Sequence, residues 1–410
     1  MIYFQAEKRG FFTILYDVIV VGGGPTGSYT ARNLSEAGYS VLVLERRKKM
    51  GGRVCCTGII SQNCLDTFHI DGDLIQRKVN SATIYSPSGK KMRLWRRENQ
   101  ACIIDRALFD KYMAEKAQEV GVKYLFKNTV EEIITEIDHV TVKTDSQYEY
   151  KSRVAVIAGG FGSKLTKKLG LNEPVDCVFG AQIDVNSECI DETEVFTGKR
   201  VAPGFFAWLV PTLPNRALAG LLSRNDPKGH LKKLLFALKN EGKIDYDDRE
   251  IDCRGITIKP LTKTYGQRFI VVGDAAGQVK PTTGGGIYFG LLSAEIAVRN
   301  LKKALKENNF SARSLSRYQR EWKNELWQEL KVCYWARKLY ERLSDQQIDR
   351  IFEITTASGI DRAFLEADDI SFDWHGKAIL RFTRQQAMIK SLKVIKVPLK
   401  FALSRKSDDR

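Results

Sequence analysis

The sequence has no long apolar run. No stretch approaches the roughly 18 consecutive apolar residues of a membrane-spanning helix, although 43% of the 410 residues are hydrophobic. The eight cysteines are scattered without Cys-x-x-Cys spacing, the four histidines do not cluster, and no repeat or low-complexity segment stands out. These absences argue against a disulfide framework, a zinc site or a disordered chain. We therefore expect a globular protein with reduced thiols and no bound metal.

Positive charge is concentrated near the C-terminal end. The net charge is +16, and residues 376–410 contribute +8 of it from ten Lys or Arg and two Asp. Apolar and basic side chains there recur at helical spacing on adjoining faces: Met388, Leu392, Ile395 and Leu399, and Lys390, Lys393, Lys396 and Lys400. The pattern favours either a helix on an anionic membrane surface or a solvated tail. We expect a cytoplasmic protein, with peripheral contact at the inner membrane face through residues 376–410 and no nucleic-acid partner.

Residues 17–47 carry the strongest local signal. A β-rich apolar run, Val18 to Val21, leads into Gly22-x-Gly24-x-x-Gly27, then a helical pattern and a second apolar run that ends at Glu45. In such a unit the glycines permit a tight turn, close approach of a pyrophosphate and close helix packing. The pyrophosphate sits at the positive end of the helix, and the acid binds a ribose. The order of these parts predicts a dinucleotide-binding unit.

Two further glycine-rich segments follow much later. In Val272-Gly273-Asp274-Ala275-Ala276-Gly277 a buried strand ends in a carboxylate that can accept hydrogen bonds from a sugar-like chain. Thr283-Gly284-Gly285-Gly286-Ile287 is a run whose backbone can lie against a flat ring. An aspartate that caps a helix before a flexible loop is the plain alternative. Together with the first unit, the two segments predict one flavin pocket.

The chain resembles the flavoprotein group typified by p-hydroxybenzoate hydroxylase, through the glycine fingerprint, Asp105-Arg106-x-x-Phe109-Asp110 and Gly273–Gly277. Within that group it is most similar to the geranylgeranyl reductases over residues 17–300. Three segments carry the narrower resemblance: Cys56-Thr57-Gly58-Ile59-Ile60-Ser61, Pro203-Gly204-Phe205-Phe206-Ala207-Trp208-Leu209-Val210-Pro211, and Lys280 to Ile287.

The resemblance implies an α/β fold: a Rossmann-like FAD-binding domain, an inserted antiparallel β-sheet substrate domain and a helical C-terminal region. We expect the FAD-binding domain at 14–75, 101–170 and 255–300, the substrate domain at 76–100 and 171–254, and the helical region with its basic tail at 301–410. Trp322, Trp327 and Trp335 of that region are assigned to the core.

Residue by residue, the resemblance implies that FAD is held through Glu45 on the adenosine ribose, Arg106 on the phosphate side and Asp274 on the ribityl chain. The predicted cofactor set is Gly22, Gly24, Thr26, Gly27, Glu45, Arg46, Cys56, Arg106, Val130, Asp274, Gly284, Gly285, Gly286 and Ile287. Cys56 is the candidate catalytic residue, with the alternative that it is a small buried hydrophobe. The predicted substrate contacts are Phe206, Trp208 and Pro211.

The implied activity is reduction of isolated double bonds in a geranylgeranyl or other prenyl chain on a lipid. The alternatives are an FAD-dependent monooxygenase or halogenase and a non-catalytic flavin- or lipid-binding protein. Two departures from the family pattern stand out: Gly159-Gly160 replaces an Asp-Gly pair, and Phe206 replaces a tyrosine. No second complete nucleotide fingerprint is found, so the electron donor is NAD(P)H or another reductant.

Overall fold

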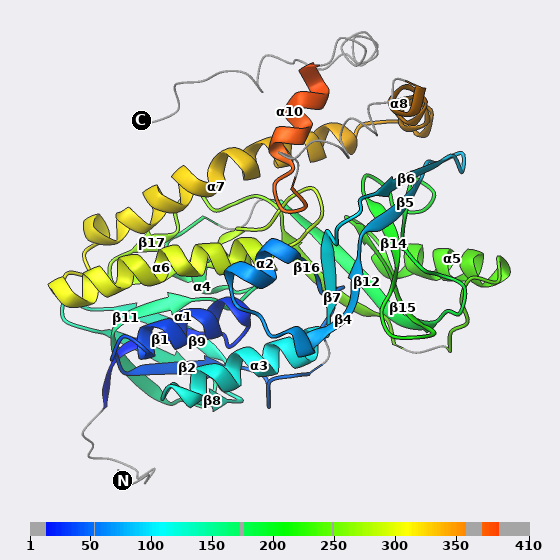
Figure 1. Cartoon of the computed structure of the whole chain (residues 1–410). Coiled ribbons are helices and arrows are strands. Elements are labelled where there is room, and N and C mark those ends of the chain that lie inside the picture. The colour runs from blue at the N-terminus through cyan, green and yellow to red at the C-terminus, as the bar shows by residue number, and fades with distance from the viewer. Residues whose placement is uncertain (1–13, 53, 173–175, 248–249, 358–370, 385–410) are drawn as a thin grey trace.

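Two large β-sheets dominate the molecule, and long helices cover the first of them (Figure 1). The computed structural model describes residues 14–52, 54–172, 176–247, 250–357 and 371–384. The first sheet has eight strands, with β1 between β2 and β11 in parallel register. Its members are β1 (Leu15–Val21), β2 (Val41–Glu45), β8 (Lys123–Phe126), β9 (Val130–Thr135), β10 (Val140–Thr144), β11 (Glu149–Ile157), β17 (Tyr265–Gly266) and β18 (Phe269–Val271). This is the predicted Rossmann-like unit, and the strand expected at Val18 to Val21 is confirmed as part of β1.

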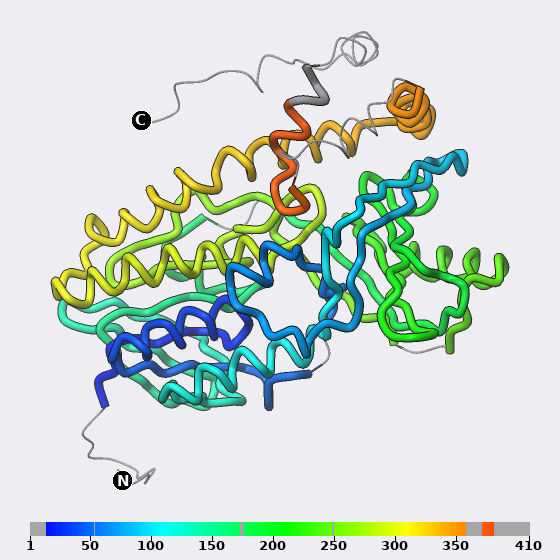
Figure 2. The backbone as a smooth tube through the Cα atoms, viewed as in Figure 1, coloured from blue at the N-terminus to red at the C-terminus, as the bar shows by residue number. Residues whose placement is uncertain are grey.

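Helices pack on one face of this sheet around a buried core. Apolar side chains of β1, β2 and β11 meet those of the helices in one continuous cluster, while the hairpin of β9 and β10 contributes to the cluster on the other face. Figure 2 shows two of the helices, α6 and α7, running side by side. The helices are α1 (Pro25–Ser35), α3 (Arg106–Glu119), α6 (Ile287–Glu307) and α7 (Ala312–Tyr340).

The second large sheet has seven strands and receives chain from three parts of the sequence. All neighbouring strands are antiparallel except β13 and β5, which are parallel. In spatial order they are β16 (Asp252–Thr257), β12 (Cys177–Asn186), β15 (Arg216–Ser223), β14 (Phe206–Pro211), β13 (Thr193–Thr197), β5 (Ser81–Tyr85) and β6 (Lys91–Trp95). Helix α5 (Pro227–Asn240) buries its leucines against one face of this sheet. The predicted domain boundary at 255 falls inside β16.

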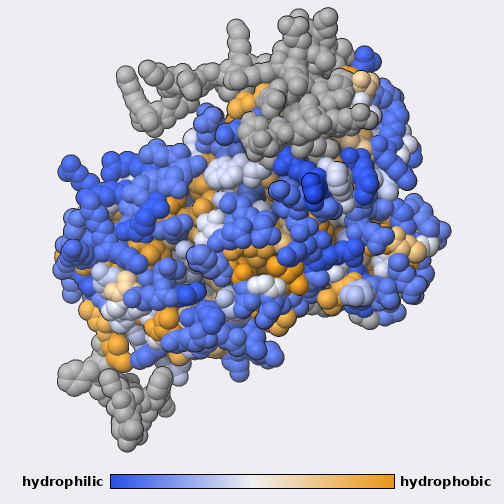
Figure 3. Space-filling model, in the orientation of Figure 1, coloured by the Kyte–Doolittle hydropathy of each residue, from blue (hydrophilic) through white to orange (hydrophobic). Residues whose placement is uncertain are grey.

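A three-stranded sheet and short helices complete the middle of the molecule. The sheet consists of β3 (Ile59–Ser61), β7 (Ala101–Ile104) and β4 (Ile75–Val79), with β7 between the other two. The short helices are α2 (Gln62–Thr67), η1 (Gly72–Leu74), α4 (Leu165–Lys168) and η2 (Gly273–Ala276). Near the middle of the face in Figure 3, apolar side chains reach the surface among hydrophilic surroundings.

The C-terminal region is helical as expected, with α7 followed by α8 (Asp345–Ala357) and α10 (Gly376–Arg384). One assignment there is wrong in part: Trp322 is fully buried, but Trp327 and Trp335 are 37% and 47% exposed. The three residues do not share one helix face, so α7 buries only the first. The predicted amphipathic pattern from Met388 to Lys400 lies outside the described residues. None of the described helices combines the length and apolar character needed to cross a bilayer.

Candidate functional site

The first glycine turn has the geometry that the fingerprint predicts. Gly22 has φ +103°, and Gly27 packs so closely that a methyl group there would lie 2.0 Å from the Gly22 carbonyl oxygen. Gly24 differs, because nothing lies within 4 Å of the place where its side chain would be. Gly22 and Gly27 therefore make the strand–helix junction, while Gly24 leaves open space at the start of α1, where a pyrophosphate needs backbone access.

Glu45 lies beside this turn at the end of β2. Its side chain is buried, with Oε2 accepting the Gly23 N–H at 2.7 Å and Oε1 accepting the Arg47 N–H at 2.9 Å. Arg46 is exposed next to it. Val130 begins β9 and is partly buried against the second core cluster. The carboxylate is thus fixed at the end of β2, beside the glycine turn, where the prediction places a ribose.

The three distant glycine segments meet in the fold. Thr26 in α1 touches the second segment and the first turn of α6, just after the third: its Oγ1 would lie 2.9 Å from a methyl group placed on Gly273 and 2.6 Å from one placed on Gly290. A methyl group on Gly286 would lie 2.5 Å from Asp274 Oδ1. The turn after β18 and the start of α6 therefore close around the first turn of α1. This convergence is the arrangement on which the predicted flavin pocket depends.

Arg106 reaches this place from the first turn of α3. Asp105 caps the helix by accepting the N–H groups of Ala107 and Leu108 at 2.8 and 3.0 Å. The Arg106 guanidinium is buried, and its Nη2 lies 2.8 Å from Asp110 Oδ1, whereas Nε and Nη1 have no partner in the described part of the chain. Burial acts to lower the pKa of Arg106, but Asp110, Cys56 and Asp274 together raise it above its ordinary value.

Cys56 lies next to this guanidinium, within hydrogen-bonding reach of it. The carbonyl oxygen of Cys56 accepts the Gln182 side-chain amide at 3.3 Å, which ties the cysteine loop to β12 of the substrate sheet. The neighbouring Cys55 points to the substrate sheet, where its Sγ lies 3.7 Å from the carbonyl oxygens of Gly180 and Asp252, and burial raises the pKa of its thiol to about 12. The two adjacent thiols therefore lie in different surroundings.

Arg254 lies at the predicted flavin pocket, although no sequence motif points to it. It lies in β16, and its Nη2 is 4.0 Å from Asp274 Oδ2. The same nitrogen would be 2.8 Å from a methyl group on Gly160, one of the two glycines that replace the family's Asp-Gly pair. No local motif surrounds Arg254, and only the pairing of β16 with β12 brings it to the pocket.

One face of the seven-stranded sheet forms an apolar wall beside the flavin loop, residues 280–286. The wall consists of Val178, Phe205, Phe206, Trp208, Leu222, Ile256 and Ile258. A methyl group on Gly284 would lie 3.1 Å from Ile256 Cδ1 and 3.4 Å from a Leu222 methyl. Gly285 accepts the Lys280 N–H through its carbonyl oxygen at 3.0 Å, and Ile287 packs against the cluster around β3 and β7. The loop thus lies directly against the wall.

Phe206 and Trp208 are neighbours within this wall, with ring centroids 5.9 Å apart. Side chains alternate along a strand, so Pro211 falls on the side of Ala207 and Leu209, which pack toward α5. This placement does not support the predicted substrate contact of Pro211.

The flavin loop is held from behind by the C-terminal region. The buried Arg337 of α7 donates Nη1 to Gly204 O at 3.1 Å and Nε to Pro281 O at 3.4 Å, and also bonds Thr282 O. Lys280 Nζ donates to Phe372 O at 2.7 Å, and Thr282 Oγ1 lies 3.0 Å from His375 Nδ1. Burial, and then the charge of Lys280, lowers the pKa of His375 to about 3.

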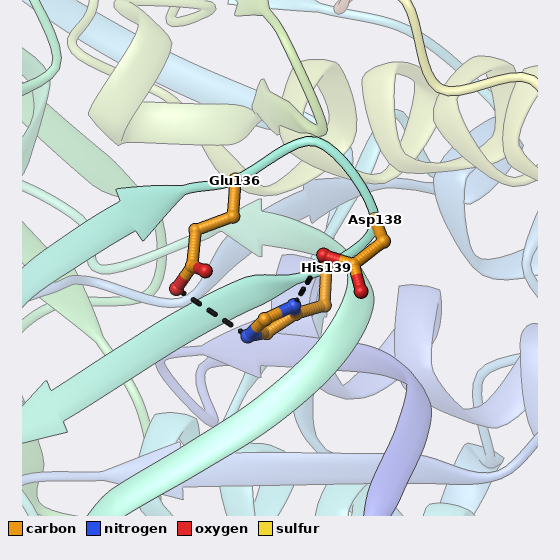
Figure 4. Close-up of side chains that lie close together, drawn as sticks. All are labelled: Glu136, Asp138 and His139. Atoms are coloured by element: carbon orange, nitrogen blue, oxygen red, sulfur yellow. Dashed lines mark hydrogen bonds and ion pairs between the residues drawn. The ribbon is translucent and has the colours of Figure 1, made fainter.

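A separate group of side chains of the types that can bind a metal ion, Glu136, Asp138 and His139, lies at the turn between β9 and β10 (Figure 4). His139 Nδ1 is 2.7 Å from Asp138 Oδ1, and its Nε2 is 3.3 Å from Glu136 Oε1. Both carboxylates are exposed, and Glu136 also accepts the Thr141 hydroxyl at 3.0 Å. Hydrogen bonds within the turn account for this arrangement, and it lies apart from the pocket residues.

Three observations indicate that the pocket residues fit FAD. Space is open at Gly24, the carboxylates of Glu45 and Asp274 lie at two separated parts of the pocket, and two buried N–H-bearing atoms of Arg106 are without a partner among the described residues. Buried donors of this kind need an acceptor, and phosphate or flavin oxygens supply one.

Comparisons with known proteins find an FAD-binding domain and reductase relatives. A family model described as an FAD binding domain matches residues 15–202. The digeranylgeranylglycerophospholipid reductase of Methanocaldococcus jannaschii is 31% identical over 85% of this chain and 93% of its own length. A reductase of the same name from Methanopyrus kandleri is 31% identical over 82% of this chain and 90% of its own.

Solved structures show the same fold. A geranylgeranyl bacteriochlorophyll reductase-like protein from Thermoplasma acidophilum superposes with a TM-score of 0.81 at 24% identity, covering 93% of this chain and 98% of that one. The flavin-dependent brominase Bmp2 has a TM-score of 0.69 at 16% identity, covering 92% and 100%. This chain therefore belongs to the digeranylgeranylglycerophospholipid reductase family and is an FAD-dependent oxidoreductase of the geranylgeranyl reductase type.

Proposed function

We propose that this enzyme reduces isolated double bonds of geranylgeranyl or related prenyl chains carried on a lipid. The names of the relatives at 31% identity support this substrate class. The observation that carries the proposal is the apolar wall, whose Ile256 and Leu222 lie against Gly284 of the flavin loop. A flat cofactor on that loop would have an aliphatic and aromatic surface facing it, which suits a hydrocarbon chain.

The cofactor would be held by residues from all three glycine segments. The open start of α1 at Gly24 would take the pyrophosphate, Glu45 the adenosine ribose, and Asp274 the ribityl chain, with Arg106 donating from its unpaired nitrogens. Bound FAD supplies the hydride chemistry, and the protein supplies position and electrostatics.

The wall would position the alkene and exclude water. An isolated double bond has no carbonyl beside it to take up charge, so its reduction depends on close and fixed geometry. Phe206 and Trp208 present rigid surfaces for this purpose, and Phe205 behind them is buried between the guanidinium groups of Arg337 and Arg224. Cys56 lies in a loop that contacts both Arg106 and β12. It is our candidate for a residue that acts at the reacting carbon atoms.

The test is a lipid assay with the FAD-loaded enzyme and a reductant. Digeranylgeranyl glycerophospholipid is incubated with dithionite-reduced enzyme, and the products are analysed by mass spectrometry. We expect the mass of the lipid to rise by two hydrogen atoms for each reduced double bond. An oxygen-dependent hydroxylated or halogenated product, with the prenyl double bonds intact, would contradict the proposal and favour the monooxygenase or halogenase alternative.

We further propose peripheral contact with anionic membranes through residues 376–410, and NAD(P)H or another reductant as the electron donor. The charge of +8 in 35 residues supports the first proposal, since each basic residue near an anionic surface contributes about 1 kcal/mol. Sedimentation with anionic vesicles should fall when Lys390, Lys393, Lys396 and Lys400 are replaced by Gln. Equal sedimentation of this variant and the unaltered protein would contradict the membrane contact.

A further inference from the structure

Two buried polar atoms on the apolar wall have no hydrogen-bond partner among the described residues: Trp208 Nε1, a donor, and Gln182 Oε1, an acceptor. We propose that these two atoms together bind one hydroxyl group. This inference deepens the proposed function, because it adds a polar subsite to a wall that is otherwise apolar.

The strand register brings the two side chains into one row. Gln182 in β12 is paired with Gly220 in β15, and Gly220 is paired on its other side with Trp208 in β14. Residues paired across a sheet project to the same face. Neighbouring strands lie about 4.8 Å apart. Strand β15, which carries Gly220, lies between β12 and β14, so the backbones at Gln182 and Trp208 are two strand spacings apart.

Gly220 makes room for the indole between them. A methyl group at Gly220 would lie 2.5 and 2.6 Å from Trp208 Cζ2 and Cε2, so the six-membered ring and the carbon bonded to Nε1 lie over the glycine. The ring therefore extends from β14 toward β12, and its nitrogen lies over the same row as the Gln182 amide. The other end of that amide is already fixed, because Gln182 Nε2 donates to Cys56 O at 3.3 Å.

Two other buried side chains of these types have partners among the described residues. Trp322 Nε1 donates to Thr264 Oγ1 at 2.9 Å, and Gln278 Oε1 accepts the Gly273 N–H at 2.8 Å. A buried polar group without a partner destabilises the fold. Two such groups in one row beside the predicted catalytic cysteine are therefore best explained by a ligand group that pairs with both.

A hydroxyl group has the chemistry that the pair requires. It accepts a hydrogen bond from the indole N–H and donates its own proton to the amide oxygen. A carboxylate or an ether oxygen could only accept, and an ammonium group could only donate, so each would leave one atom unpaired. Two sources supply a hydroxyl: an alcohol group of the bound lipid, or a water molecule retained beside the hydrocarbon chain.

The experiment observes the Trp208 indole directly, without turnover. FAD-loaded protein with 15N-labelled tryptophan is titrated with geranylgeraniol and, separately, with its methyl ether, which can accept a hydrogen bond but cannot donate one. The Trp208 indole signal is the one that Trp208→Phe removes. The Trp322 signal is the internal control, because its N–H is already bonded to Thr264.

If the lipid supplies the hydroxyl, geranylgeraniol shifts the Trp208 signal and binds about tenfold more tightly than the ether, and Gln182→Met abolishes the preference. If water supplies it, the alcohol and the ether bind equally, and the ligand-free protein shows a Trp208 indole–water cross-peak that Gln182→Met removes. Either result supports the subsite. Equal binding together with no indole contact to ligand or water would overturn it.

The variants must remain folded for these outcomes to count, so melting temperature and FAD content are measured with each. The result is separable from the proposed function. A protein that fails to hydrogenate the prenyl lipid but shows the indole contact would lose the proposed activity and keep the subsite. A protein that hydrogenates the lipid but shows no indole contact would keep the proposed activity and lose the subsite.

Discussion

The two large sheets contribute to the pocket in different ways. The eight-stranded sheet, which we call the parallel sheet because the strands around β1 are parallel, presents its predicted cofactor residues at strand ends and at the first turns of helices, so each one belongs to a short motif such as Gly22 to Gly27. The antiparallel sheet presents Gln182, Trp208 and Arg254 from the middles of three different strands. The first arrangement depends on local backbone geometry, and the second depends on register between strands. Substitutions should therefore have different consequences in the two sheets.

The largest expected effect is at the glycine turn of the parallel sheet. A methyl group at Gly27 would lie 2.0 Å from Gly22 O, so Gly27→Ala should lower the free energy of unfolding by about 3 kcal/mol and abolish FAD binding. Gly24→Ala meets open space and should fold normally, yet bind FAD far more weakly. Thermal unfolding and flavin titration of both variants check this. Normal FAD binding by Gly24→Ala would show that the pyrophosphate lies elsewhere.

The next effect is at the junction between the two sheets. Arg337 bonds carbonyl oxygens of both the flavin loop and Gly204, so Arg337→Met should reduce the free energy of unfolding by about 1–3 kcal/mol. Turnover should fall while FAD stays bound. The exposed Arg342 is the matched control, and Arg342→Met should change neither quantity. Unaltered turnover in Arg337→Met would show that the junction does not position the wall.

A smaller effect depends on pH. Folding holds the pKa of His375 at about 3, below the ordinary 6.5, so the unfolded chain takes up the proton first as the pH falls. The resulting loss of stability is absent above about pH 6.5 and grows toward pH 4, reaching about 1–3 kcal/mol. His375→Gln should flatten this slope in denaturant titrations. His69→Asn, at an exposed histidine with φ +49°, should leave the slope as it is.

The smallest effect separates the adjacent cysteines. Cys56→Ala should keep FAD but change the rate, by about tenfold or less, or change how many double bonds are reduced. Cys55→Ala should change neither, because burial keeps the Cys55 thiol protonated with a pKa of about 12. Product distributions from both variants check this. Identical distributions would remove Cys56 from the reaction.

The difference between local backbone geometry and register between strands also explains what could be predicted from the sequence. The helix at Arg106–Glu119 and the hairpin of β5 and β6 were predictable, because Asp105 caps the first and Pro87-Ser88-Gly89 turns the second. The convergence of Thr26, Asp274 and Gly286 followed from motifs of known geometry. In each case the signal lies within a few residues of the feature.

The rest could not be predicted, because it depends on contacts between distant segments. Nothing near Gln182 or Arg254 in the sequence marks them, and their places follow from strand pairing alone. The assignment of Trp327 and Trp335 to the core failed because their helix is buried on one side only. The contact of His375 with the flavin loop joins residues 93 positions apart.

The most direct test of the account is an anaerobic single turnover. The FAD-loaded enzyme is photoreduced, mixed with digeranylgeranyl glycerophospholipid without oxygen, and followed by flavin absorbance. We expect the oxidised flavin spectrum to return in proportion to the hydrogenated lipid formed, because the wall would place the alkene against the cofactor. A flavin that stays reduced until oxygen is admitted would contradict it.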